Sequence, residues 1–187
     1  MPGVRVLPGA QEARVIWAFS FLQAEVDLVS RDLSKHYQFM DYALQEAQKA
    51  IKLGEIPIGA IVVDETGNVV ASGYNLRETA ADPTAHAEIL ALRAAGKVLG
   101  DWRLEKCSLY VTLEPCPMCA GAIVNARIKN LIFGAYDPKA GAAGTLMDVT
   151  SHPKLNHRVN VTGGVRAEEC AALLRLFFGK LRSGMIP

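Results

Sequence analysis

Two short motifs constrain this chain more than any other part of its sequence: His86-Ala87-Glu88 and Pro115-Cys116-Pro117-Met118-Cys119. Together they offer one imidazole, two thiols and one carboxylate. A catalytic zinc ion usually has three protein ligands and keeps a fourth position for water, whereas a structural zinc ion has four Cys or His ligands. Three good ligands are present, so the motifs predict a catalytic zinc site formed by His86, Cys116 and Cys119.

The remaining acidic residue, Glu88, is then available for chemistry. Zinc lowers the pKa of a bound water to about 7, so a zinc-bound hydroxide exists at neutral pH. We expect Glu88 to take the proton from that water and deliver it to the substrate, which is general acid and base catalysis by one group. Residues two apart point to nearly opposite sides of a regular helix. His86 and Glu88 are therefore expected at a helix N-terminus that lines a pocket.

The two cysteines fit the same interpretation. Pro115 suits the first turn of a helix, where the helix dipole and the free N–H groups lower the pKa of a thiol. Cys116 and Cys119 are three positions apart and share one helical face. The alternative is a pair of surface thiols and an unrelated histidine, which the glutamate, the prolines and the spacing disfavour.

Length and composition indicate a soluble globular protein of one domain. The chain has 187 residues, of which 50% are hydrophobic and 21% charged. The four cysteines do not resemble a disulfide scaffold, so a reducing cytosol is the simpler setting, and Cys107 and Cys170 are expected to be buried. The stretch from Val15 to Val29 contains Glu25 and Asp27 and is shorter than the ~20 apolar residues of a membrane span. Neither a membrane segment nor a signal peptide is expected.

Charge restricts how the chain can bind a nucleic acid. The net charge is +1, so such a partner must meet a local basic patch. The segment from 127 to 158 contains five basic and two acidic residues, so its local charge is +3. The basic residues are Arg127, Lys129, Lys139, Lys154 and Arg158, and the acidic residues are Asp137 and Asp148. This segment is rich in loops, and long loops are often functional.

Hydrophobic periodicity and turn residues predict alternating helices and strands. The expected elements are a helix from Tyr37 to about Leu53, strands at 58–63 and 69–74 forming a hairpin, a helix from an N-cap at Thr84 to Val98, a strand at 108–112, a helix from Cys116 to Arg127, strands at 130–135 and 159–162, and a helix at 167–179. This order predicts an α/β fold with three layers, α/β/α, and a central mixed sheet of about five strands. Ligands of such folds bind beyond the strand ends, where both motifs fall.

The pattern His-x-Glu followed by Pro-Cys-x-x-Cys resembles the signature of the cytidine/deoxycytidylate deaminase superfamily, the zinc nucleoside and nucleobase deaminases. Longer segments are similar to bacterial tRNA-specific adenosine deaminases, namely residues 82–89, 112–123, 134–144, 155–159 and 168–174. The resemblance extends from about residue 36 to residue 180. We therefore expect an N-terminal extension of unknown role, residues 1–34, and a single zinc-dependent deaminase domain, residues 35–187.

The resemblance implies a cytidine-deaminase-like fold, a cytoplasmic homodimer and one zinc ion per chain, with Glu88 as the proton shuttle. The reaction it implies is hydrolysis of the wobble adenosine of a tRNA anticodon to inosine, with an arginine tRNA bearing ACG as the partner. The family's substrate contacts correspond to six positions: Asn75 and Ala87 at the target nucleotide, Asp137, Lys139 and Asn156 in the loops near the anticodon, and Phe178, beside Phe177, on the C-terminal helix. A flipped base of a loop needs a pocket, cations and apolar surface.

Simpler interpretations exist for several of these residues. Asn75 could be only a turn residue, and Lys139 only a solvated charge. Phe177 and Phe178 are adjacent, so at most one faces the core squarely. Two further histidines, His152 and His157, are expected to be hydrogen-bonded loop residues.

Two other functions compete with the tRNA activity. The same zinc and glutamate would serve a deaminase of a free base or nucleoside, such as guanine, cytosine or cytidine, but such an enzyme does not need the basic loops. A zinc-stabilised RNA-binding module without catalysis is the other alternative. Glu88 argues against it, because a structural site gains nothing from a carboxylate beside an open coordination position.

Overall fold

The computed structural model describes residues 33–185. The chain divides into two units, Met1–His36 and Tyr37–Pro187, and the sheet and the site belong to the second. The predicted boundary between an extension and a deaminase domain, at residue 35, falls at the edge of the described residues and stays a prediction. The stretch from Val15 to Val29 lies outside them. Within residues 33–185 no helix is long and apolar enough to cross a membrane.

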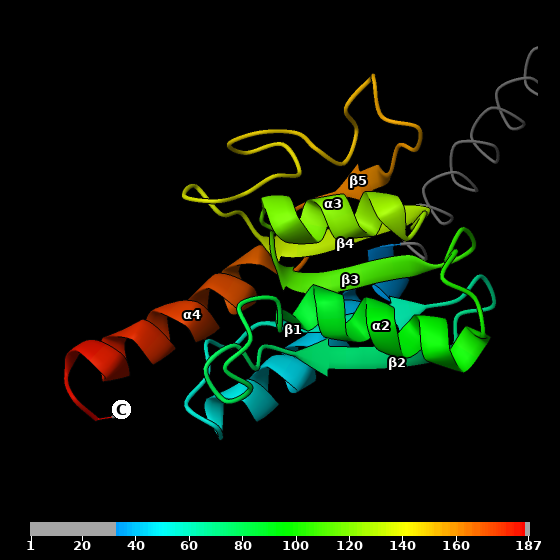
Figure 1. Ribbon diagram of the computed structural model, residues 1–187. Coiled ribbons are helices and arrows are strands. Elements are labelled where there is room, and N and C mark those ends of the chain that lie inside the picture. The colour runs from blue at the N-terminus through cyan, green and yellow to red at the C-terminus, as the bar shows by residue number, and fades with distance from the viewer. Residues whose placement is uncertain (1–32, 186–187) are drawn as a thin grey trace, which may run out of the picture. The chain divides into compact units, whose positions relative to one another are not determined.

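All the elements expected from periodicity are present (Figure 1). A helix over residues 33–51 precedes β1 (Gly59–Val63), β2 (Val69–Tyr74), α2 (Ala87–Leu99), β3 (Ser108–Leu113), α3 (Pro117–Asn125), β4 (Asn130–Ala135), β5 (Asn160–Thr162) and α4 (Ala167–Arg182). The strands form one sheet in the order β2-β1-β3-β4-β5. β1 is antiparallel to β2 and β3, whereas β3, β4 and β5 are parallel. The predicted mixed sheet of five strands is confirmed.

Helices cover both faces of this sheet, as a three-layer α/β/α fold requires. Alternate residues of β1 enter two separate cores, because successive side chains of a strand point to opposite faces. Ala60 and Val62 pack with α2 and α3, and Ile61 and Val63 pack with Met40 of the first helix and with α4. Figure 1 shows α2 and α3 side by side on one face of the sheet.

A glycine allows α2 to lie very close to the sheet. A Cβ atom at Gly73 of β2 would lie 2.6 Å from the carbonyl oxygen of Ala87 and 2.7 Å from the nitrogen of Ala91. Contacts this short are not tolerated, so only glycine fits here. The end of β2 is therefore held against the beginning of α2, where the first predicted motif lies.

The structure corrects the predicted start of α2. Its N-cap is His86, and the backbone N–H and hydroxyl of Thr84 both donate to Oδ1 of Asp82, at 2.8 and 2.7 Å. Thr84 is thus used in a turn before the helix, although threonine is a common N-cap.

The predicted bounds of the helix at Cys116 to Arg127 are also corrected. Cys116 is the N-cap of α3, and Pro117, not Pro115, occupies the first turn. The helix ends at Asn125, and Arg127 adopts a φ of 61°, a left-handed conformation that stops a helix.

Candidate active site

The first turns of α2 and α3 bring the two motifs together. His86 and Cys116 are the N-caps of α2 and α3, and Cys119 lies in the first turn of α3. Nδ1 of His86 lies 3.8 Å from Sγ of Cys116 and 3.6 Å from Sγ of Cys119. The potential ligand atoms of the three residues all lie within 4.8 Å of one another. The predicted grouping of ligands is therefore present in the structure.

The donor set fits a zinc ion. One imidazole and two thiolates are ligands that zinc prefers, and three protein ligands are the number found in catalytic sites. Among the residues that the structure describes, no other group of three or more His, Cys, Asp or Glu side chains comes together in this way. The cluster is therefore the one candidate metal centre of this part of the chain.

Electrostatics also favour a cation at the cluster. A hydrogen bond from the Cys119 thiol, with help from His86, lowers the pKa of Cys116 to about 4. The hydrogen bond to Cys116, together with burial, raises the pKa of Cys119. In return, the hydrogen bond with Cys116 raises the pKa of His86. One thiolate thus forms readily, and a second negative charge beside it needs a cation to stabilise it.

Glu88 lies in the first turn of α2, directly beside this cluster. It is buried, with 4% of its surface exposed, and it interacts with Cys116, His86 and Cys119. Burial is the main cause that raises its pKa, and the negative charge of Cys116 adds to the effect. A carboxyl group with a raised pKa can both accept and return a proton, as the sequence predicts for Glu88.

Asn75 and Ala87 lie at the same place in the fold. Asn75 follows β2 and is buried. Its neighbour Leu76 donates its N–H to the carbonyl oxygen of Ala85 at 3.0 Å, one residue before His86. Ala87 is the first residue of α2 and is fully buried. Both residues are therefore beside the candidate metal centre, and their contact with a nucleotide stays a prediction.

Sequence reasoning missed a buried carboxylate next to the second motif. Glu114 is 2% exposed, and it accepts N–H groups of Asp137 (3.1 Å), Ala143 (3.1 Å) and Thr145 (3.0 Å). Burial would raise its pKa, but these hydrogen bonds outweigh burial and lower it. The hydrogen bonds of Glu114 thus hold the loop after β4 next to the segment that carries Cys116. The sequence feature that could have indicated this role is the position of Glu114, a charged residue directly after the apolar strand β3.

The other predicted contacts in the loops have different hydrogen-bond partners. The backbone N–H of Asp137 donates to Glu114, and Oδ1 of Asp137 accepts the N–H of Lys139 at 2.9 Å. Asn156 instead accepts a hydrogen bond from Arg127 at 2.8 Å, beyond the C-terminal end of α3. It therefore lies away from the helix start that holds Cys116. Its role in binding RNA stays a prediction.

The remaining predictions concern side chains on α4 and in loops. Phe177 is buried (4% exposed), whereas Phe178 is 37% exposed, so one of the two faces the core, as expected. α4 packs against β3 and β4, on the sheet face opposite to α2 and α3. His157 bonds the carbonyl oxygen of Ile128 at 2.7 Å and His152 accepts an N–H at 3.3 Å, which confirms them as hydrogen-bonded loop residues.

The sheet order and the paired helix starts define a deaminase of the cytidine-deaminase-like class, and comparisons with known proteins agree. A family model described as MafB19-like deaminase matches residues 34–182. The tRNA-specific adenosine deaminase of Bacillus subtilis (strain 168) is 51% identical over 144 residues, which cover 77% of this chain and 89% of the relative.

Solved structures show the same likeness. A structure from a study of A-to-I editing by tRNA:A34 deaminases at the wobble position of transfer RNA has a TM-score of 0.70 and 45% identity, and the match covers 73% of this chain and 99% of the other. Guanine deaminase from Nitrosomonas europaea has a TM-score of 0.65 and 29% identity over 76% of this chain and 84% of the other. The chain belongs to the family of tRNA-specific adenosine deaminases.

Proposed function

We propose that this protein hydrolyses the wobble adenosine of a tRNA anticodon to inosine and releases ammonia. The observation that carries this proposal is the complete group of His86, Cys116, Cys119 and Glu88 in a chain that is 51% identical to a tRNA-specific adenosine deaminase. One water is consumed and one ammonia is released when the 6-amino group of adenosine becomes the 6-oxo group of inosine.

His86, Cys116 and Cys119 would hold one zinc ion per chain. A zinc ion held there lowers the pKa of a bound water and so supplies a nucleophile at neutral pH. The carboxylate of Glu88 accepts the proton of the attacking water and later delivers it to the leaving amino group, so that ammonia departs. Its burial keeps bulk water from competing for this proton, and its raised pKa suits both transfers.

The start of α2 also offers groups that recognise the base. The first N–H groups of a helix have no partner within the helix, so the N–H of Ala87 can donate to a ring nitrogen of adenine, and Asn75 lies beside it. A base of an anticodon loop can reach these groups after it is flipped out of its stack. The substrate base would thus be fixed by the same turn that carries Glu88.

The loop after β4 would bind the rest of the anticodon. Lys139 is exposed and can contact phosphate. The segment 127–158 has a local charge of +3, to which Arg127 and Lys129, just before β4, contribute together with the loop. Exposed apolar side chains of this region, Tyr136 (57%), Leu146 (57%) and Leu155 (41%), offer surface on which unstacked bases can pack. We extend the proposal to an arginine tRNA with the anticodon ACG, and to Asp137, Asn156 and Phe178 as further contacts.

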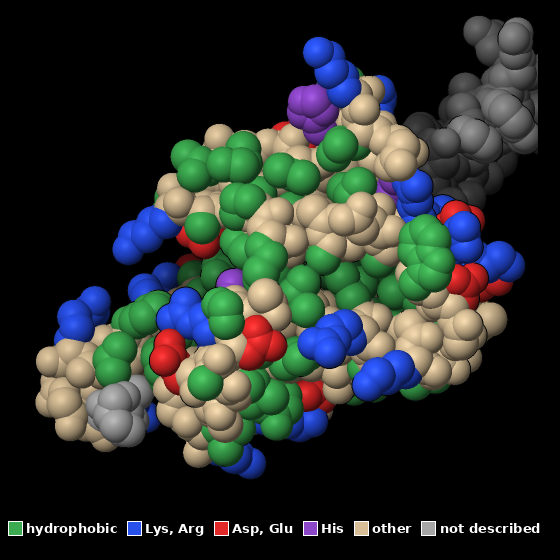
Figure 2. All heavy atoms as spheres, viewed as in Figure 1, with side chains coloured by type: hydrophobic (Ala, Val, Ile, Leu, Met, Phe, Trp, Pro, Cys, Tyr) green, Lys and Arg blue, Asp and Glu red, His purple; other side chains and the backbone are tan. Residues whose placement is uncertain are grey.

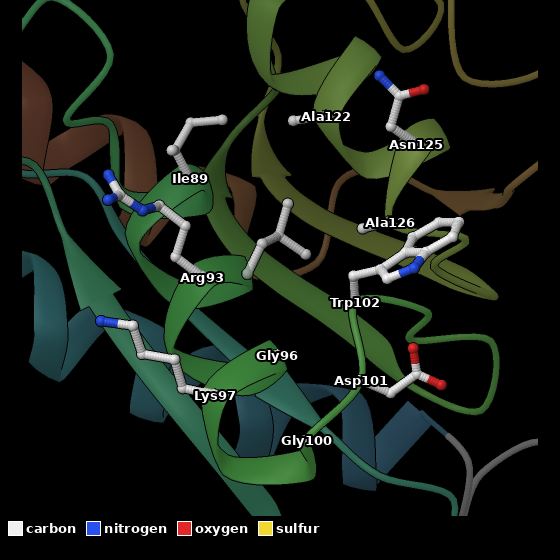
Figure 3. A pocket seen from close by; sticks show the side chains of 11 residues that line it. Ile89, Arg93, Gly96, Lys97, Gly100, Asp101, Trp102, Ala122, Asn125 and Ala126 are labelled. Atoms are coloured by element: carbon white, nitrogen blue, oxygen red, sulfur yellow. The ribbon is translucent and has the colours of Figure 1, made fainter.

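We further propose that the protein is a homodimer and that the second copy covers the groove between α2 and α3. This groove has a volume of about 630 Å³, and its walls come from both helices and the segment after α2 (Figure 3). Trp102 stands at its edge with 57% of its surface exposed. Figure 2 shows apolar side chains gathered between the two helices, with basic side chains near them. Arg93 and Asp101 in the same groove give opposite charges that a two-fold contact can pair.

Deamination of a free base is the second candidate, because the guanine deaminase structure shares this fold. The zinc-loaded protein should be incubated with an ACG anticodon stem-loop and, separately, with free adenosine, guanine and cytidine, and the released ammonia should be measured. Reaction of the stem-loop alone would support the tRNA activity. Reaction of a free compound without reaction of the stem-loop would keep the site chemistry and overturn the substrate.

A further inference from the structure

A third buried acidic side chain, after Glu88 and Glu114, lies beside Asn75, and none of the roles above uses it. Glu55 follows the first helix and is 1% exposed. Burial of a carboxylate is costly unless hydrogen bonds compensate it. Its two oxygens accept from different donors: Oε2 from Nδ2 of Asn75 at 2.9 Å, and Oε1 from the backbone N–H of Thr79 at 2.6 Å. Glu55 therefore joins the end of β2 to the loop that leads to His86.

The hydrogen bond between Asn75 and Glu55 determines the orientation of the Asn75 amide. A carboxylate only accepts hydrogen bonds, so Asn75 must turn its NH2 group toward Glu55. Oδ1 of the same amide then points away from Glu55. Within residues 33–185 this oxygen has no hydrogen-bond partner, and it is not completely enclosed. It is an unused acceptor on a side chain that is otherwise 4% exposed.

The position of this acceptor is fixed relative to the metal ligands. The N–H of Asn75 donates to the carbonyl oxygen of Ile58 at 3.0 Å, and the N–H of Leu76 donates to Ala85 at 3.0 Å. The close approach of Gly73 to Ala87 holds the end of β2 against the first turn of α2. Asn75 is thus anchored at its backbone by the sheet and at its side chain by Glu55, next to His86.

We propose that Glu55 is a positioning residue that fixes the Asn75 amide with Oδ1 toward a hydrogen-bond donor of the target nucleoside. The inference rests on the proposed deaminase function and deepens it, since it states which polarity the pocket presents at this point. A nucleoside that places a donor there is held, and one that places an acceptor there is disfavoured. Glu55 touches no substrate atom itself and acts through Asn75.

The variant Glu55→Gln tests this orientation. The N–H of Thr79 can only donate, so it keeps the single oxygen of the new glutamine. The new NH2 group then faces Asn75, whose amide must reverse and present NH2 to the nucleoside. Loss of a hydrogen bond at a polar pocket predicts a fall of roughly 10- to 100-fold in kcat/KM on the stem-loop, with zinc content unchanged.

The double variant Glu55→Gln/Asn75→Asp separates positioning from a general structural role. The carboxylate introduced by Asn75→Asp would accept from the glutamine and still present an acceptor to the nucleoside, so we expect kcat/KM to recover to within about tenfold of wild type. The single variant Asn75→Asp, with two carboxylates face to face, should be less active than the double variant. A double variant that is worse than both single variants would overturn the proposal.

Two controls complete the experiment. Glu65→Gln removes an exposed carboxylate that pairs with Lys106 and should leave kcat/KM unchanged. In wild type, the NMR signals of the Asn75 NH2 group should show slow exchange with solvent, and fast exchange would overturn the proposal even if Glu55→Gln fails to fold. An inactive wild type would count against the proposed function alone, whereas an active wild type with an equally active Glu55→Gln would count against the positioning role alone.

Discussion

Glu88 is the side chain whose surroundings most directly determine the chemistry of the site. It lies in the first turn of α2, two residues after the histidine and against both thiols. The same helix start therefore carries a potential metal ligand and the carboxyl group that we propose as the proton carrier. Burial raises the pKa of Glu88, as catalysis by one shuttling group requires.

Glu88→Gln should keep zinc and lose turnover. The amide cannot accept the proton of water, so kcat for inosine formation is expected to fall by about 10²- to 10⁴-fold. Metal analysis and inosine chromatography of the same preparation check both parts. Glu105→Gln, at an exposed position, is the matched control. Equal turnover of the Glu88→Gln protein would contradict the assigned role.

Cys119→Ala should remove the metal. Cys119 is fully buried at the cluster, and loss of one of three ligands leaves two, too few for tight binding. Zinc per chain is expected to fall close to zero after dialysis against a chelator. The control is Cys107→Ala, because Cys107 is also buried but lies in the apolar core. If both variants retain equal zinc, the ligand set is wrong.

At the scale of elements, β2 and β4 could be predicted residue for residue, because their apolar patterns and turn residues are local signals. The start of α4 at Ala167 was predicted as well. The starts of α2 and α3 were not, since Thr84, although a common N-cap residue, donates its N–H and hydroxyl to Asp82 in a turn before α2. The grouping of His86, Cys116 and Cys119 was predictable from the spacing of the two motifs. Glu55 and Glu114 were not, because their partners are backbone and side-chain N–H groups 20 to 31 positions away in the sequence.

Glu114→Gln should loosen the loop after β4 and leave the metal centre in place. The glutamine offers one acceptor oxygen to N–H groups of Asp137, Ala143 and Thr145, so buried donors lose their partner, at a cost of about 1–3 kcal/mol in the free energy of unfolding. Thermal unfolding and limited proteolysis between residues 137 and 146 measure this. The KM for tRNA should rise. A loop as resistant to protease as in wild type would show that Glu114 does not organise it.

At the scale of the whole molecule, two surfaces lie beside the site. In the proposed function, the groove of α2 and α3 would contact a second copy, and the loop after β4 would contact RNA through Lys139. The net charge of +1 is too small to attract RNA from every side. Binding should therefore depend on these local surfaces.

If the proposed dimer forms through this groove, Ile89→Arg should convert it into a monomer. Ile89 lines the groove, and a cation placed there would lose its water in the interface without a partner. Analytical ultracentrifugation at several concentrations measures the change in mass. Val98→Arg is the control, since Val98 lies on α2, is 67% exposed and does not line the groove. A wild-type protein that sediments as a monomer would contradict the proposed interface.

The most direct test of the proposed function is to map the position of inosine in a reacted arginine tRNA. The zinc-loaded protein is incubated with the full-length transcript, and the product is sequenced, since inosine is read as guanosine. We expect conversion of the wobble adenosine and of no other adenosine, and no conversion with Glu88→Gln. Absence of conversion, or conversion spread over several adenosines, would contradict it.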